Sequence, residues 1–270
     1  MDRPMHRGRV WTEPPAVEEP KEHQYALGKI IAIWTLATAP MPFLAFGVAP
    51  SFAPAGTADG TLVVWYLMIA GMAWQFVLSL ILLHGESGLR NWSAIKKRIW
   101  LQAPKNPHTG IARPRLFLWL IPAFLFYVAI EFTGIGTAIG ELILVPFPQL
   151  AALPTLDLSD LESPHLKGAW WLVGVAILSS VFNYFLGEEL LFRGILLPKM
   201  RGVFGRWDWV ANSILFGLYH LHRPTQMLGF VISGLAWPLL VSRYRSIWFA
   251  LILHGIEGLF VVGVTVAIVS

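Results

Sequence analysis

Long apolar stretches, separated by polar connections, constrain this chain more than any other feature of its sequence. A helix needs about 20 apolar residues to cross the hydrocarbon core of a bilayer. The first three stretches and the last reach that length, and neighbouring residues could extend the others. The stretches are residues 26–49, 61–83, 115–137, 168–187, 209–221, 228–241 and 246–268. They predict an all-α, polytopic transmembrane helical bundle of about seven or eight spans, in which residues 142–153 are the uncertain eighth.

The composition excludes several other classes of protein. Hydrophobic residues make up 56% of the chain and charged residues only 13%, about half the roughly 25% of an average globular protein. A disordered protein, a coiled coil and an ordinary cytosolic enzyme are therefore excluded. The chain has no cysteine, which excludes disulfides, thiolate catalysis and cysteine-ligated zinc or iron–sulfur centres.

The sequence divides into three parts. Residues 1–25 are polar and proline-rich, and we expect them to form a disordered cytoplasmic tail. Residues 26–160 supply the N-terminal transmembrane helices, with a basic cytoplasmic connection at 84–114. Residues 161–270 form the remaining helical core, which holds most of the charges expected at membrane depth.

The Lys and Arg residues predict the orientation in the membrane. They concentrate in the tail, in the 84–114 connection, after the fourth stretch and before the last, whereas the alternate loops contain few. Cytoplasmic loops carry such an excess of positive charge, so we expect an integral, multi-pass membrane protein with a cytoplasmic N-terminus. The net charge of +4 then reflects topology and contact with the lipid bilayer, and no nucleic-acid partner is expected.

Ionisable residues inside the apolar stretches are the candidate functional groups, because each costs at least ~2.5 kcal/mol at the bilayer centre. On a helix, Glu189 and Arg193 are four residues apart and can form an ion pair, whereas Glu188 points about 100° away. An unpaired carboxylate at that depth suits a general base. The full set is Glu188, Glu189, Arg193, His220, His254 and Glu257, with Glu131 and Glu141 as further candidates.

Three of these residues are predicted to lie in one layer of the membrane. Counted from the basic loops at ~1.5 Å per residue, Glu188 lies ~16 Å deep, His220 ~18 Å and His254 ~12 Å. A carboxylate and two imidazoles at a common depth are typical of a site that activates water. The alternatives to a catalytic role are structural: a Glu189–Arg193 pair that only stabilises the fold, and histidines that are packed or hydrogen-bonded at helix ends.

Three motifs in this part of the chain resemble the CPBP family, the intramembrane proteases that include the type II CAAX prenyl endopeptidases. They are Glu188-Glu189-x-x-x-Arg193, Phe216-x-x-x-His220 and His254, in family order within residues 168–260. The resemblance implies a glutamic intramembrane endopeptidase, a hydrolase of the CAAX type. Its substrate would be a membrane protein or peptide, prenylated in some relatives.

The resemblance also implies roles for single residues. Catalysis would fall to Glu188, which activates water, with His220 and His254; Glu189, Arg193, Phe216 and Glu257 would support them. The family usually has asparagine four residues after the last histidine, as an oxyanion donor, but this chain has Gly258. Ser213, His254 itself or a protonated Glu257 are the substitutes that the sequence offers.

Alternative functions remain open at this point. The departure at Gly258 favours a catalytically weak or inactive membrane scaffold or immunity protein of the same fold. No cofactor is expected, but zinc held by His220, His254 and Glu188 is an alternative, although the sequence has no HExxH motif. A proton-relaying transporter is disfavoured, because the charges cluster in one half and no repeat is visible.

Overall fold

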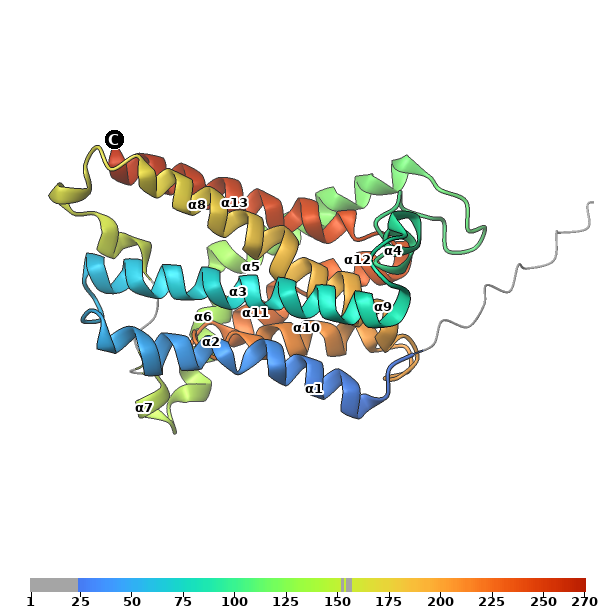
Figure 1. Cartoon of the computed structure of the whole chain (residues 1–270), viewed down its shortest axis with the longest axis horizontal. Coiled ribbons are helices and arrows are strands. Elements are labelled where there is room, and N and C mark those ends of the chain that lie inside the picture. The colour runs from blue at the N-terminus through green and yellow to red at the C-terminus, as the bar shows by residue number, and fades with distance from the viewer. Residues whose placement is uncertain (1–23, 152, 154–156) are drawn as a thin grey trace, which may run out of the picture.

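The computed structural model describes residues 24–151, 153 and 157–270, and within them it is a bundle of helices without strands (Figure 1). The all-α prediction is confirmed. The predicted tail, residues 1–25, lies almost entirely outside the described residues. The helices are α1 (Leu27–Thr38), α2 (Pro40–Pro42), α3 (Ala58–Ser87), α4 (Trp92–Arg98), α5 (Leu120–Thr133), α6 (Ile135–Leu144), α7 (Pro148–Ala151), α8 (Trp171–Val181), α9 (Leu197–Met200), α10 (Asp208–Tyr219), α11 (Met227–Ser233), α12 (Ala236–Tyr244) and α13 (Trp248–Val269).

Six helical segments of the described chain are long and apolar enough to cross a membrane. They are Leu27–Ser51, Ala58–Glu86, Pro114–Thr133, Trp171–Met200, Met227–Tyr244 and Trp248–Val269. The prediction of about seven spans differs at the stretch 209–221, most of which lies in α10 (Asp208–Tyr219), a helix of only 12 residues. At 1.5 Å per residue, such a helix spans only about 18 Å of the roughly 30 Å hydrocarbon core.

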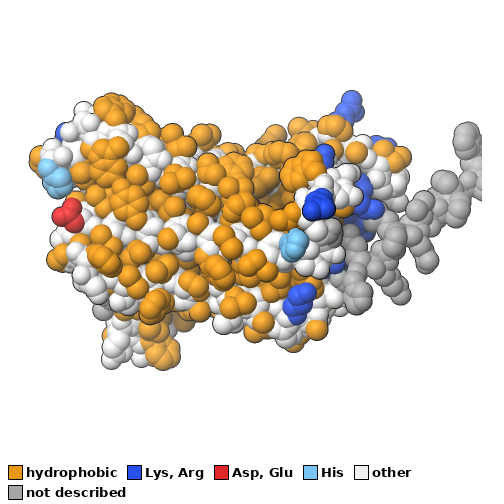
Figure 2. Space-filling view, in the orientation of Figure 1, with side chains coloured by type: hydrophobic (Ala, Val, Ile, Leu, Met, Phe, Trp, Pro, Cys, Tyr) orange, Lys and Arg blue, Asp and Glu red, His pale blue; other side chains and the backbone are white. Residues whose placement is uncertain are grey.

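The surface has the character of a protein embedded in lipid. Apolar side chains cover most of the face in Figure 2, and Lys and Arg gather at the end where α4 and α9 lie (Figures 1 and 2). Large side chains such as Phe132, Leu259 and Phe260 are mostly exposed, which is unfavourable in water but normal against lipid tails. The chain is therefore an integral membrane protein.

The uncertain segment 142–153 begins as the end of α6 and continues into the short α7. Helix α6 packs closely on α11, because Gly136 faces Gly229 so tightly that a Cβ atom on Gly136 would lie 2.4 Å from the Gly229 Cα. Gly140, one turn later, would meet the Thr225 carbonyl oxygen in the same way. This small-residue contact, typical of membrane helices, holds α6 against the bundle.

The helix of residues 171–200 is not a regular α-helix, and this irregularity positions the two adjacent glutamates. The π-helical segments η6 (Phe182–Gly187) and η7 (Leu190–Leu196) flank Glu188 and Glu189. Such widened turns occur frequently at functional sites. They rotate the side chains away from the directions that a 3.6-residue period predicts.

Arg98 at the end of α4 stabilises the far end of this irregular helix. Pro198 has no N–H, so the Gly194 carbonyl lacks its usual α-helical donor. The Arg98 guanidinium donates to the carbonyl oxygens of Gly194 and Ile195, each at 3.3 Å, and also pairs with Glu86. The basic connection 84–114 thus contains α4, whose last residue contacts the helix that bears the glutamates.

Candidate active site

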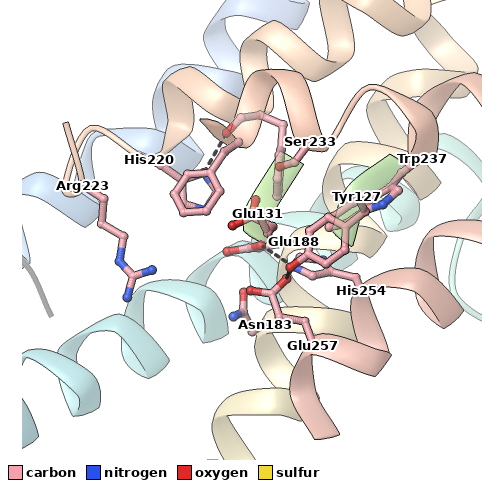
Figure 3. A pocket seen from close by; sticks show the side chains of 13 residues that line it. Tyr127, Glu131, Asn183, Glu188, His220, Arg223, Ser233, Trp237, His254 and Glu257 are labelled. Carbon is pink, nitrogen blue, oxygen red and sulfur yellow. Dashed lines mark hydrogen bonds and ion pairs between the residues drawn. The ribbon is translucent and has the colours of Figure 1, made fainter. Parts of the chain in front are cut away.

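A cavity of about 50 Å³ lies inside the bundle, with room for a few water molecules. Its walls come from α5, the 171–200 helix, α10 with the turn after it, α11, α12 and α13 (Figure 3). The lining residues are Tyr127, Glu131, Asn183, Glu188, Phe216, His220, Arg223, Phe230, Ser233, Gly234, Trp237, His254 and Glu257. The three residues predicted to share one layer, Glu188, His220 and His254, all line it.

Glu188 occupies the middle of this site, between His220 and His254 in the view of Figure 3. Its side chain is 3% exposed, and its Oε2 lies 3.9 Å from Nε2 of His254. That separation is too long for a direct hydrogen bond. The Glu188 carboxylate lines the cavity without a direct hydrogen bond to this imidazole.

Glu189, Arg193 and His254 form a fully buried ion cluster on the neighbouring face of the helix. Arg193 Nη1 lies 3.2 Å from Glu189 Oε1, and the same oxygen accepts a 2.9 Å hydrogen bond from His254 Nδ1. Because a buried charge is costly unless it is paired, each member of this cluster depends on the others. The predicted pairing of Glu189 with Arg193 is present, and His254 also contacts the carboxylate of this pair.

Phe216 connects the arginine to the histidine of the second motif. The Arg193 guanidinium carbon lies 3.8 Å from the centre of the Phe216 ring, a cation–π contact that favours the buried charge. The same ring lies edge-on to His220, with 4.9 Å between ring centres. The spacing Phe216-x-x-x-His220 thus places an aromatic spacer between the ion cluster and the cavity.

His220 ends α10 and has one nitrogen fixed by the backbone. Its Nδ1 lies 2.9 Å from the Phe216 carbonyl oxygen, which can only accept, so Nδ1 carries a proton. In the neutral ring, Nε2 then has a free lone pair on a residue that lines the cavity. Such a nitrogen can accept a proton or a hydrogen bond from water.

Glu257 lies on the opposite side of His254 from the ion cluster. Its Oε2 is 3.7 Å from His254 Nε2 and accepts a 3.2 Å hydrogen bond from the Tyr127 hydroxyl. Glu131, on the same helix as Tyr127, also lines the cavity, whereas Glu141, the other charged candidate, is exposed. Helix α5, which contains no motif, therefore contributes two polar residues to the site.

Ser213, one of the substitutes considered for the missing asparagine, is not placed for that role, and position 258 itself has no space for an asparagine. The Ser213 hydroxyl donates to the Val231 carbonyl oxygen at 2.8 Å, and Ser213 does not line the cavity. Gly258 faces away from the cavity onto α8 and η6: a Cβ atom there would lie 2.6 Å from the Tyr184 ring and 3.2 Å from the Ser180 hydroxyl. An asparagine side chain therefore has no room at this position.

The zinc alternative would need three donors arranged round one point. In the part of the chain that the structure describes, no group of three His, Asp or Glu side chains is arranged to hold a metal ion. The set His220, His254 and Glu188 lines the cavity but does not form such a group. We derive no step of the reaction through a metal.

Several cavity residues escaped the sequence analysis because no regular spacing pointed to them. Asn183 precedes Glu188 by five residues, which on an α-helix places it about 140° away; only the π-helical turn brings it to the same side. Ser233 and Trp237 lie on α11 and α12, whose apolar stretches contain no charge that would have singled them out. Tyr127 could have been suspected only from its proximity in sequence to Glu131.

These observations define a class of protein: an integral membrane protein with a buried, water-sized cavity lined by carboxylates and imidazoles. A family model described as Type II CAAX prenyl endopeptidase Rce1-like matches residues 168–260, which include Glu188, His220 and His254. Over this third of its length the chain is similar to that family, and the predicted resemblance is confirmed. The family consists of proteases, a class of hydrolases. No curated protein and no solved structure matches the chain.

Proposed function

We propose that the protein is a glutamic intramembrane endopeptidase that hydrolyses a peptide bond with water activated by Glu188. One observation carries the proposal: Glu188, His220 and His254 come from three separate helices and line one cavity large enough for water. The buried Glu188 carboxylate makes no direct hydrogen bond to the nearest imidazole, that of His254, whose Nε2 lies 3.9 Å away. It is therefore available to a water molecule within its reach.

The proposed hydrolysis needs no reactant other than water and the peptide substrate. Glu188 takes a proton from water while the water oxygen bonds to the carbonyl carbon of the substrate, and the π electrons of that carbonyl move to its oxygen. His254, whose Nδ1 donates to Glu189, presents Nε2 to the cavity and stabilises the developing negative charge when that nitrogen is protonated. When the C–N bond breaks, the proton on Glu188 passes to the leaving nitrogen, which yields a carboxylic acid and an amine.

His220 has a different part in the proposed mechanism. Its Nδ1 is held by the Phe216 carbonyl, so the ring cannot turn without losing that bond. With Nε2 directed to the cavity, His220 accepts a hydrogen bond from the attacking water and fixes its lone pair toward the substrate. A positioned imidazole of this kind typically contributes to rate through orientation as well as proton transfer.

The substrate class follows from the family and the surroundings of the site. The matching family model is one of prenyl endopeptidases, and the cavity lies among helices whose outer surfaces suit lipid tails (Figure 2). We therefore propose a membrane-associated protein or peptide that bears a prenyl chain near the cleaved bond. The lipid chain would reach the site from the bilayer, whereas the peptide would approach from the membrane surface.

The orientation of the protein is part of the same proposal. Residues 24–26, α4 and α9 lie at one end of the bundle (Figure 1), the end at which Lys and Arg gather (Figure 2). By the distribution of positive charge, this end faces the cytoplasm. A tag placed before α1 in membrane vesicles of known sidedness should be cut by protease only from the cytoplasmic side; cutting from the opposite side would reverse the assignment.

The test of function uses purified protein in liposomes and a farnesylated peptide with three residues after the modified cysteine. Mass spectrometry should find release of the C-terminal fragment by the parent protein and none by Glu188→Gln, with or without a chelator. Cleavage that is lost on chelation and restored by zinc would replace the glutamic mechanism with a metal-dependent one. Binding of the peptide without cleavage by either protein would favour the membrane scaffold.

A further inference from the structure

Asn183 faces Glu188 across the widened turn of the 171–200 helix. The structure brings its carboxamide to the carboxylate: with the amide nitrogen turned toward Glu188, that nitrogen lies 2.7 Å from Oε1 and 2.9 Å from Oε2. The opposite orientation would place the amide oxygen against two carboxylate oxygens, all of them acceptors. The hydrogen bonds therefore fix which way the amide points.

This contact depends on the π-helical segment. Residues five apart lie about 140° from each other on a regular α-helix, but η6 covers Phe182–Gly187 and ends directly before Glu188. The wider turn brings positions five apart to one side of the helix. Figure 3 shows Asn183 in the cavity wall beside Glu257 and below Glu188. The π-helical turn thus places a hydrogen-bond donor beside the candidate base.

We infer that Asn183 is a positioning residue for Glu188, which sets the orientation of the carboxylate and favours its charged form by donating hydrogen bonds to it. The inference rests on the proposed function, in which Glu188 takes a proton from water. Donors to a carboxylate stabilise the ionised state, and a carboxylate whose lone pairs are partly occupied has fewer orientations in which to meet a water molecule. Both effects act through Glu188 and do not require Asn183 to touch the substrate.

Other charged and titratable groups surround Glu188 from the neighbouring elements, and they stay in place when Asn183 changes. They are Glu189 and Arg193 on its own helix, Tyr219 on α10, and His254 and Glu257 on α13. Because this background is common to the parent protein and its variants, a difference between them reports on the carboxamide.

The experiment compares the parent protein with Asn183→Leu, which keeps the size of the side chain and removes its donors. Infrared difference spectra of protein in liposomes are recorded as a function of pH, and the carboxyl band absent from Glu188→Gln is assigned to Glu188. In Asn183→Leu, the midpoint of this band should move to higher pH by about one pH unit or more, the size expected for losing hydrogen bonds to a charged group. An unchanged midpoint would overturn the inference.

Turnover of the farnesylated peptide gives a second readout. In Asn183→Leu, kcat should fall about tenfold or more with little change in KM, because positioning is lost and binding is kept. Asn183→Gln, which retains the amide on a longer side chain, should recover part of kcat and of the infrared midpoint. If Asn183→Leu had the same kcat and the same infrared midpoint as Asn183→Gln, a role for the amide would be excluded.

Asn212 provides the matched control. It is fully buried, whereas Asn183 is partly buried, and the Asn212 amide donates to the Phe192 carbonyl oxygen at 2.9 Å and does not line the cavity. Asn212→Leu should lower the yield of folded protein while the Glu188 band keeps its midpoint. The infrared readout does not depend on turnover. An active Glu188→Gln protein would therefore refute the proposed function, while the infrared midpoint would still test whether Asn183 donates to Glu188.

Discussion

Two adjacent glutamates on one helix face two different surroundings, and the contrast explains how the site is built. Glu189 belongs to the ion cluster with Arg193 and His254, where Arg193 and His254 both contact its Oε1. Glu188 faces the cavity, where its nearest imidazole nitrogen is 3.9 Å away and its close contact is the Asn183 amide. Glu189 is thus paired with charged side chains inside the protein, whereas Glu188 faces the cavity.

His254 connects the two surroundings, because one ring nitrogen serves each. Nδ1 belongs to the ion cluster, whereas Nε2 lies between Glu188 at 3.9 Å and Glu257 at 3.7 Å. A histidine held in this way by a carboxylate keeps a fixed tautomer and a fixed ring orientation. The ion cluster therefore organises the cavity. Substitutions in the cluster should first lower stability, whereas substitutions in the cavity should lower turnover.

The largest effect on turnover is expected for Glu188→Gln. The amide keeps the shape of the side chain but cannot take a proton, so kcat should fall by about 10²–10⁴-fold, the usual contribution of a general base. The thermal unfolding midpoint should stay within about a degree or two of the parent, since the only ion pair that we describe for Glu188 is the long 3.9 Å contact with His254. The exposed Glu141→Gln is the control and should keep full turnover. Equal losses in the two variants would contradict the division between cavity and surface.

The largest effect on stability is expected for Arg193→Ala. Removing the guanidinium leaves Glu189 as a buried charge without its arginine partner, which typically costs about 3–5 kcal/mol. We expect a lower yield of folded protein and a lower unfolding midpoint in detergent or lipid. Arg206→Ala, at an exposed position, should change stability by no more than about 0.5 kcal/mol. Parent-like unfolding of Arg193→Ala would mean that the cluster is not essential to folding.

An intermediate effect is expected for Gly258→Asn. The sequence alone suggests that an asparagine here would restore an oxyanion donor and raise the rate, but the Tyr184 ring occupies the space. Overpacking of this kind costs about 1–3 kcal/mol, so the variant should be less stable and no faster. Gly263→Ala on the same helix, where nothing lies near the added atom, is the steric control. A faster Gly258→Asn enzyme would show that Tyr184 can move aside.

The smallest effect is expected for Tyr127→Phe, which removes one hydrogen bond to Glu257. A single bond of this type contributes about 0.5–1.5 kcal/mol, so the change in kcat/KM should stay within roughly tenfold. Tyr66→Phe, on a half-exposed tyrosine of α3, should match the parent in the same assay. A loss as large as that of Glu188→Gln would move Glu257 from a supporting to a central role.

The amino-acid sequence was sufficient to predict the class of fold and to identify the residues most costly to bury. The apolar stretches are long because a bilayer offers no partner to an exposed backbone, so all-helical spans were the available solution. The charges inside them were conspicuous because each is expensive at that depth. The length of α10 was the exception, since a 13-residue apolar stretch is compatible with either a short helix or the core of a span.

The surroundings of each charged residue depend on how the helices pack. The 3.6-residue period separates Glu188 from Glu189 correctly, but it cannot reveal that π-helical turns bring Asn183 to Glu188. Nor could it show that α5 supplies Tyr127 or that the Tyr184 ring fills the space beside Gly258. These contacts join residues distant in sequence or depend on a local change of helical period, and both are set by how neighbouring helices pack rather than by the spacing of residues along the chain.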